Sequence, residues 1–249
     1  MPSVAVLALL AVSALVTSFI SGILGMAGGM ILMGILLAVL PLPVAMMLHG
    51  ITQLASNGWR ALMWRKEVDW RVFRGYMYGA IVMTVFFAVV KLVVSKPIAL
   101  IAMGLTPFLT LALPEKLHLN VERKGHATAC GIICTTLSLT SGVSGPILDV
   151  FFVRSKMGRH GVIATKAMTQ SLSHILKIVY FGAFVAVGGG NVHPGLAAMM
   201  VALAFIGTSL SKHVVARMND QSFRMWTRWT VMTLGVMYLF GGVKLALGW

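Results

Sequence analysis

The chain has 249 residues, of which 58% are hydrophobic and only 10% are charged. About a quarter of the residues in a soluble globular domain are charged, so the composition excludes an ordinary soluble protein and indicates one that spans the membrane several times. In a soluble protein the net charge of +14 would suggest nucleic-acid binding. Here most basic residues fall in short connections between apolar runs, which is typical of the positive-inside bias. A positive interior that favours anions agrees with the same charge, so we expect a lipid bilayer and no nucleic acid as partner.

The first half of the chain begins with an apolar run over residues 4–40. This run is too long for a single crossing of about 20 residues, and a glycine-rich stretch at 21–29 interrupts it. Three further crossings are predicted at 45–64, 73–94 and 98–113, joined by short turns and a basic loop.

The second half repeats this order. The run 126–153 is broken at 141–146, and basic loops on both sides of it predict that it enters from the cytoplasm and returns there as a re-entrant hairpin. Three crossings follow at 162–187, 196–211 and 229–247.

Each half is therefore expected to contain a broken hairpin plus three transmembrane helices. The first repeat, residues 1–114, starts outside, whereas the second, residues 115–249, starts in the cytoplasm, so their orientations are opposite. Two inverted repeats are the architecture of many secondary transporters. We predict an all-α, polytopic fold with both termini outside. Lys91 and Lys96 would lie near the outer face and count against this topology, which three basic loops support.

One polar stripe occurs in each half, in otherwise apolar surroundings. The pattern T-Q-x-x-S-[N/H]-x-x-[R/K] appears twice, with an offset of 117 residues. Its spacing of i, i+1, i+4, i+5 and i+8 places the polar side chains on one face of a helix. We expect the two stripes to form facing walls of one polar site. Its residues would be Thr52, Gln53, Ser56 and Asn57, followed by Arg60, and Thr169, Gln170, Ser173 and His174, followed by Lys177.

The two glycine-rich breaks are predicted to add backbone donors to this site. Non-helical backbone at membrane depth is tolerated only where protein buries it or where it lines a wet cavity. Half-helix ends at such breaks direct free N–H groups toward an anion. Close helix packing is the alternative reason for glycine and serine, but two clusters at equivalent positions favour the site. The residues assigned to it are Gly25, Gly28, Gly29, Ser141, Gly142, Ser144 and Gly145.

Two cations end the stripes. Lys177 lies well inside a predicted crossing, which favours a functional role over snorkelling to the interface. Arg60 is nearer a helix end, and for it the two interpretations have equal weight. We expect Lys177→Ala and Gln170→Ala each to abolish transport.

Two residues are candidates for proton coupling. Asp149 is the only carboxylate inside an apolar segment, and His174 is the second candidate. The alternative for Asp149 is a structural pair with Arg154. His49, near a predicted helix start, receives low weight as a site residue.

The sequence offers little material for a metal site or for catalysis. Cys130 and Cys134 lie one helical turn apart and are expected to pack in the interior, with contact to a sulfur substrate as the alternative. Neither an H-E-x-x-H motif nor a histidine-rich cluster is present. We therefore expect no metal and no enzymatic activity.

The glycine-rich break Gly25-Met26-Ala27-Gly28-Gly29, the apolar run that follows it to Pro41, and the echo at 141–146 resemble the sulfite exporter TauE/SafE family. This family is also called the 4-toluene sulfonate uptake permease family. The Thr/Gln/Ser helices after each break add to the resemblance, which covers almost the whole chain. It implies a bacterial-type inner-membrane permease for small anions such as sulfite or organosulfonates, without an organic cofactor.

The sequence thus predicts a secondary transporter that moves a small anion by alternating access, with protons as candidate coupling ions. A passive anion channel and an intramembrane enzyme are the alternatives. Whether the chain forms a homo-oligomer is left open.

Overall fold

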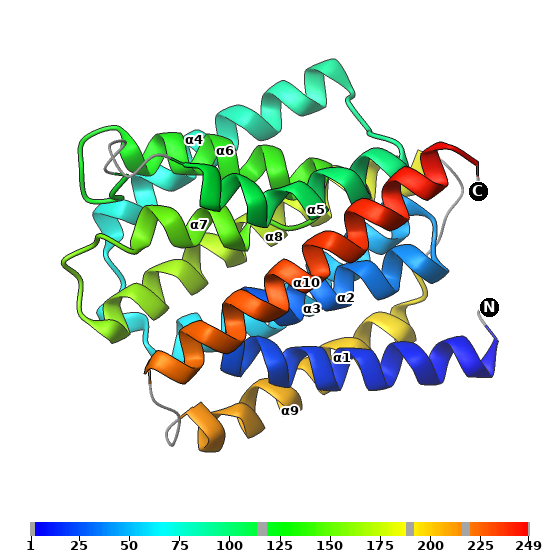
Figure 1. Cartoon of the computed structure of the whole chain (residues 1–249), viewed down its shortest axis with the longest axis horizontal. Helices are drawn as coiled ribbons and strands as arrows, with labels where there is room; N and C mark the ends of the chain where they lie inside the picture. Colours follow the sequence, from blue (N-terminus) through cyan, green and yellow to red (C-terminus); the bar gives the residue numbers. More distant parts are fainter. Residues whose placement is uncertain (1–2, 114–118, 188–191, 216–219, 249) are drawn as a thin grey trace.

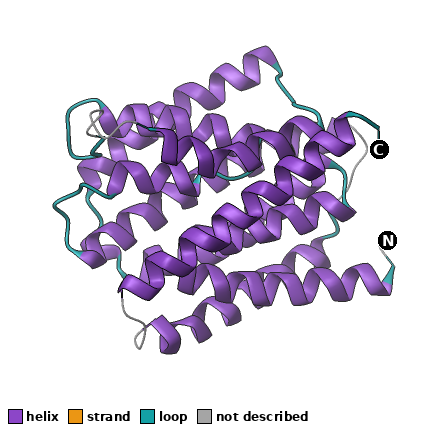
Figure 2. Cartoon of the chain, viewed as in Figure 1, coloured by secondary structure: helices purple, strands orange, loops and turns teal. Residues whose placement is uncertain are grey.

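The computed structural model describes residues 3–113, 119–187, 192–215 and 220–248 of the chain (Figure 1). These residues form ten α-helices and one short 3-10 helix, and they contain no strand (Figure 2). The all-α fold expected from the sequence is confirmed. The helices are α1 (Val4–Leu24), α2 (Met26–Val39), α3 (Leu42–Met63), η1 (Arg65–Glu67), α4 (Trp70–Val90), α5 (Lys96–Ala112), α6 (His126–Thr140), α7 (Gly145–Phe152), α8 (Arg159–Val187), α9 (Pro194–Val215) and α10 (Asp220–Ala246).

Several of these helices are suited to a bilayer. Within the described residues, four stretches are long and apolar enough to cross a membrane: Val4–Leu24, Trp70–Val90, Pro194–Lys212 and Met225–Ala246. A helix needs about 20 mostly apolar residues for this. Helices α2, α5 and α6 are apolar but shorter. Many large apolar side chains on α1, α4 and α10 face outward, as lipid contact requires, and the chain is a multi-pass membrane protein.

The two predicted breaks differ in length. The first is a single residue, Gly25, with φ 64° and ψ −108°, so the helix continues on both sides of it. This backbone conformation disfavours any residue with a Cβ atom. The expected longer break over 21–29 is therefore confined to one position. The second break spans the residues between Thr140 and Gly145 and includes Gly142 at φ 81°.

Helices α3 and α8 carry the two polar stripes and are called the stripe helices. They pack against each other in the interior of the bundle. Around this pair, α1 packs on α9, α4 on α6, and α5 on α10. Exchanging α1–α5 for α6–α10 converts the α1–α9 contact into the α4–α6 contact and the reverse, and it leaves the α3–α8 and α5–α10 contacts unchanged. The two halves of the chain therefore interlock rather than form separate bundles.

The two hairpins open toward different ends of the bundle. Helix α3 begins directly after α2, so the base of the first hairpin lies at the N-terminal end of α3. At the other end of α3, Trp64 stacks on His160 with ring centroids 4.1 Å apart. The base of the second hairpin is closed there by a hydrogen bond from Val121 N to Phe151 O of 3.0 Å. The start of α1 and the end of α10 lie at the opposite end of the bundle from this base (Figure 1).

Candidate functional site

The tips of the two hairpins touch in the interior. A Cβ atom added at Gly145, the first residue of α7, would lie 2.4 Å from Cβ of Met26, the first residue of α2. Real Cβ atoms do not approach so closely, so any side chain at Gly145 would displace Met26. The absence of a side chain at this position allows the N-termini of two helices from different halves to meet.

A small cavity opens where these tips meet the stripe helices. Its volume is about 30 Å³, enough for about two water molecules at roughly 10–15 Å³ each. The thirteen lining residues come from both hairpins and both stripe helices, and none of them is an Asp or a Glu. They are Gly25, Met26, Gly29, His49, Gln53, Asn57, Arg60, Val143, Ser144, Gly145, Gln170, Ser173 and His174.

Three side-chain nitrogen atoms of the lining residues are buried without a hydrogen-bond partner: Gln53 Nε2, His174 Nδ1 and Arg60 Nε. The Gln53 and His174 side chains are 4% and 7% exposed. A buried polar group without a partner costs about 1–3 kcal/mol. A bound group with oxygen acceptors would satisfy the Gln53 amide and could accept from His174 in the tautomer that carries its proton on Nδ1.

Helices α2 and α7 both begin at the cavity wall. Their N-cap residues, Gly25 and Ser144, make no side-chain capping hydrogen bond. The first N–H groups of a helix have no partner within it and carry the positive end of its dipole. Both helix starts therefore add partial positive charge to the same small space.

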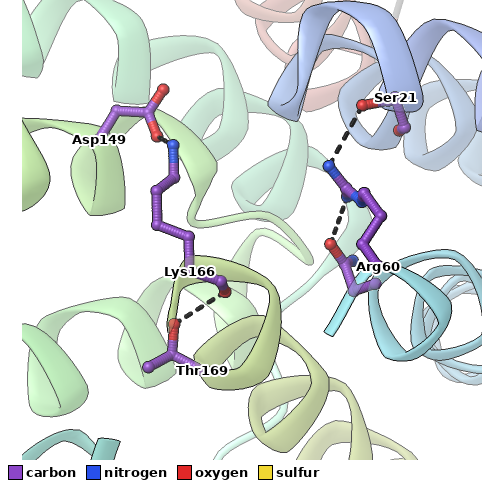
Figure 3. Close-up of polar contacts among 6 residues, drawn as sticks. Ser21, Arg60, Asp149, Lys166 and Thr169 are labelled. Carbon is purple, nitrogen blue, oxygen red and sulfur yellow. Dashed lines mark hydrogen bonds and ion pairs between the residues drawn. The ribbon is translucent and has the colours of Figure 1, made fainter. Parts of the chain in front are cut away.

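Arg60 is the cation that lines the cavity. Its guanidinium donates to Ser21 O at the end of α1, at 3.4 Å, and to Oδ1 of Asn57, one turn earlier on α3 (Figure 3). Its Nε is buried without a partner. The arginine therefore holds the first hairpin in place and retains an unused donor. These contacts agree with the functional role considered for Arg60 and not with snorkelling to the membrane interface.

Lys177 is fully buried and is not among the lining residues. Its Nζ donates to Nδ1 of His49 at 2.7 Å and to Gly142 O in the second break at 2.9 Å. His49 in turn lies 2.9 Å from Gly29 O through Nε2. The lysine thus contacts the cavity through His49.

His49 is the site residue that sequence reasoning underrated. It lines the cavity, and its ring lies edge-on to that of His174 with centroids 5.6 Å apart. The available signal was its spacing, because His49, Gln53 and Asn57 recur at i, i+4 and i+8 on one helix face. The motif began one turn too late to include it.

The structure brings nine of the predicted site residues to the cavity wall and places the others behind it. Those at the wall are Gly25, Gly29, Gln53, Asn57, Ser144, Gly145, Gln170, Ser173 and His174. Ser173 also shares a 2.6 Å hydrogen bond with Tyr76 Oη. Of the remaining predicted residues, those with hydroxyl groups bond to backbone carbonyls or to a neighbouring helix.

The hydroxyls behind the wall are engaged elsewhere. Thr52 donates to Leu48 O at 2.8 Å and Thr169 to Lys166 O at 2.9 Å, each within its own helix. Ser56 shares a 2.8 Å bond with Thr208 on α9. Ser141 Oγ donates to Leu137 O, and Gly28 allows α2 to approach α1, since its Cβ would lie 2.1 Å from Thr17 O.

Asp149 forms an ion pair with Lys166 on α8 (Figure 3). The two side chains are 36% and 26% exposed, and neither residue lines the cavity. The sequence suggested Arg154 as its alternative partner, whereas the ion pair lies across to α8.

The two cysteines lie away from the cavity. Cys130 and Cys134 are free thiols, buried with Sγ atoms 3.8 Å apart, in an apolar cluster that includes Tyr76. In the part of the chain that the structure describes, no group of three or more His, Cys, Asp or Glu residues could hold a metal ion.

A family model described as sulfite exporter TauE/SafE matches residues 9–238. The chain belongs to the sulfite exporter TauE/SafE family. Searches of curated proteins and of solved structures returned no match. The matched region of this TauE/SafE chain contains both breaks, both stripes and every residue of the cavity wall. It is thus a membrane transport protein of a family named for sulfite export, and the resemblance drawn from the glycine-rich breaks is confirmed.

Proposed function

We propose that this TauE/SafE protein is a secondary transporter for a small anion, sulfite or an organosulfonate, and that the cavity between the two breaks is its binding site. The observation that carries the proposal is the pair of unpartnered polar atoms, Gln53 Nε2 and His174 Nδ1, in a cavity that Arg60 also lines and that has no carboxylate in its wall. Such a cavity suits a ligand that supplies oxygen acceptors and negative charge.

The ligands of the anion come from both halves in this proposal. The first N–H groups of α2 and α7 would donate from the two breaks. The amides of Gln53, Asn57 and Gln170, together with the Ser173 hydroxyl and His174, would complete the shell. All of these residues line the cavity. Sulfite and sulfonate groups present three oxygens around one sulfur, a shape that several convergent donors match.

Alternating access would follow from rocking of two inverted repeats, 1–114 and 115–249. Two observations support this division. The main helix contacts exchange among themselves when the halves are exchanged, and the two hairpins have their bases at different ends of the bundle. In inverted-repeat transporters the substrate lies near the midplane at discontinuous helices, which is where this cavity lies relative to the breaks.

The proposed location is the inner membrane, with both termini outside. The connection after α3 carries Arg65 and Lys66, and the base of the second hairpin carries Arg123, Lys124 and Lys156. The connections that carry them lie at the end of the bundle opposite the start of α1 and the end of α10 (Figure 1). By the positive-inside rule that end faces the cytoplasm.

Coupling to protons is part of the same proposal. Of the two candidates, His174 lines the cavity and Asp149 does not. His174 is therefore the first to test, whereas a role for Asp149 would require its pair with Lys166 to open during the cycle.

The test is uptake of radiolabelled sulfite, thiosulfate and a sulfonate by proteoliposomes, with and without an imposed pH gradient. We expect saturable uptake of one anion that the gradient accelerates, and a fall of at least 100-fold in the double variant Gln53→Ala/Gln170→Ala. Thr84→Ala is the matched control, because this hydroxyl only bonds Ala80 O within α4.

Each other outcome has a defined meaning. Saturation-free flux that no gradient alters would identify a passive channel. Chemical conversion of the anion without transport would identify an enzyme. Absence of uptake for all three anions would reject the sulfur-anion assignment.

A further inference from the structure

Four groups form a continuous chain of hydrogen bonds between the two halves of the protein. Gly29 O on α2 contacts His49 Nε2 at 2.9 Å, and His49 Nδ1 contacts Lys177 Nζ at 2.7 Å. Lys177 Nζ also donates to Gly142 O at 2.9 Å. The chain starts in the first hairpin, passes through α3 and α8, and ends in the second break.

The partners determine the direction of every bond in this chain. A carbonyl oxygen only accepts, so His49 carries its proton on Nε2 and donates it to Gly29. The other ring nitrogen of a neutral imidazole is an acceptor, and Lys177 can only donate. His49 therefore joins a donor to an acceptor through its two ring nitrogens.

This series of hydrogen bonds has no counterpart between the residues that correspond to His49 and Lys177 in the opposite halves. By the offset of 117 residues, His49 corresponds to Lys166 and Lys177 to Arg60. A matching contact would have to join Lys166 to Arg60, and neither side chain has an acceptor. The cross-half bond is thus a departure from the duplicated plan.

Burial and packing show that the bond is held firmly. His49 is 1% exposed and Lys177 is fully buried. Gly50, next to His49, brings α8 close, because a Cβ there would lie 2.8 Å from Ile178 Cγ1 and 3.4 Å from Lys177 Cε. The two helices therefore lie close together where the bridge crosses between them.

We infer that Lys177 and His49 form a positioning bridge that sets the two breaks around the cavity, so that Lys177 acts on the anion through the breaks instead of binding it. The bridge fixes one carbonyl in each hairpin, Gly29 and Gly142, and its middle member lines the cavity. Movement of one break is thereby transmitted to the other. The consequence for transport rests on the proposed function, but the coupling between the breaks does not.

The first test needs no substrate. Hydrogen–deuterium exchange is measured on the full chain in nanodiscs, for peptides that cover 26–33 and 142–148. Lys177→Met is expected to raise exchange several-fold in both peptides. Lys166→Met, on the same helix, is the matched control and should leave the 26–33 peptide unchanged, because its partner Asp149 belongs to the second hairpin.

Two substitutions of His49 break the bridge at different points. In His49→Asn the side-chain oxygen can take the place of Nδ1 and keep the bond to Lys177, so only the 26–33 peptide should loosen. In His49→Gln the amide nitrogen can take the place of Nε2, so the 142–148 peptide should loosen more. These variants keep the inference testable if Lys177→Met fails to fold. In Lys177→Met, exchange that rises only in the 142–148 peptide, and not in the 26–33 peptide, would overturn it.

The second test uses transport of sulfite in proteoliposomes. Lys177→Met should lower the sulfite flux at least tenfold. Adding His49→Asn to Lys177→Met should change the remaining flux by less than twofold, because both substitutions break the same bridge. Adding Gln53→Ala to Lys177→Met should instead multiply the two losses. Losses of flux that multiply when His49→Asn and Lys177→Met are combined would overturn the bridge.

A second outcome would also overturn it. If Lys177→Met raises the KM much more for divalent than for monovalent anions, Lys177 is a direct ligand of the anion. If the wild-type protein moves no anion, the proposed function fails while the exchange experiment still decides the bridge.

Discussion

The two stripe helices hold their own hairpins by equivalent tethers with different chemistry. In the first half Arg60 on α3 donates to Ser21 O, near the break between α1 and α2. In the second half Lys177 on α8 donates to Gly142 O, within the break between α6 and α7. The two cations are 117 residues apart and their carbonyl partners 121. Each cation thus meets the carbonyl end of a broken helix, where positive charge is favourable.

A second tether joins each stripe helix to the second arm of its hairpin. His49 bonds Gly29 O in the first half, and Lys166 pairs with Asp149 in the second. The helix positions again differ by 117 residues and the hairpin positions by 120. The first of these tethers is buried and uncharged at its acceptor, whereas the second is a partly exposed ion pair.

In this comparison the helix contacts that form the scaffold are shared by the two halves, whereas the residues at the candidate site differ between them. The two halves keep the same contacts between the same elements. They differ in which cation meets the cavity, since Arg60 lines it and Lys177 does not.

The largest expected effect concerns two glycines at the starts of the second hairpin arms, Gly25 at the N-cap of α2 and Gly145 at the first position of α7. Gly25 needs its positive φ, whereas Gly145 needs the space that Met26 Cβ would otherwise contest at 2.4 Å. Gly145→Ala should therefore abolish measurable anion uptake, and Met26→Gly in the same chain should restore part of it by removing the contested atom. Gly25→Ala should not be rescued by Met26→Gly, because its cost is backbone strain of about 1–3 kcal/mol. Initial uptake rates in proteoliposomes measure the effect of each substitution and of its rescue. Equal rescue of the two variants would contradict the distinction between backbone strain at Gly25 and steric overlap at Gly145.

The next effect separates the two stripe cations. Arg60→Met should raise the KM for sulfite by about 100-fold, since hydrogen bonds to charged groups are worth about 1.5–3 kcal/mol and tenfold corresponds to about 1.4 kcal/mol. Arg60→Lys keeps the charge but not the fork and should recover about half of that loss on a logarithmic scale. The measurement is the dependence of uptake rate on sulfite concentration. An unchanged KM in Arg60→Met would show that the cavity cation does not contact the anion.

Much of the fold could be predicted from the sequence because membrane insertion depends on local composition. Apolar runs of about 20 residues and basic connections located the helices. The breaks were located by Gly and Pro, whose backbone properties act locally. Gly25 was placed within a wider stretch, since Ser21 and Gly22 also look like helix breakers, but only Gly25 adopts positive φ.

The site was predictable only as far as it is repetitive. The duplicated motif gave Gln53 and Gln170, which do line the cavity. It could not give the contact of His49 with Lys177, because these residues are 128 positions apart and do not correspond to one another in the two halves. Nor could spacing show that the hydroxyls of Thr52 and Thr169 would bond their own helices, a choice that depends on what each helix face meets.

A smaller effect with a reversed sign on stability is expected at Gln53. Its Nε2 is buried without a partner, so Gln53→Met should raise the free energy of unfolding of the empty protein by about 1 kcal/mol. The same change should lower sulfite uptake about tenfold, since a donor to the anion is lost. Thermal unfolding in detergent and uptake in proteoliposomes measure the two quantities. A loss of stability in Gln53→Met would indicate that the amide has a partner within the protein.

The smallest effect on uptake is expected when the tether between Lys166 and Asp149 is removed and compared with loss of the tether between His49 and Gly29. Lys166→Met removes the partner of Asp149, but an ion pair between partly exposed side chains contributes only about 0–1 kcal/mol. Sulfite uptake should therefore stay within twofold of wild type, and thermal unfolding should shift little. His49→Ala is the comparison, because it opens a buried tether next to the cavity and should lower uptake at least tenfold. A large loss of gradient-driven uptake in Lys166→Met, with downhill uptake intact, would instead place the Asp149–Lys166 pair in proton coupling and make the second tether part of the transport cycle.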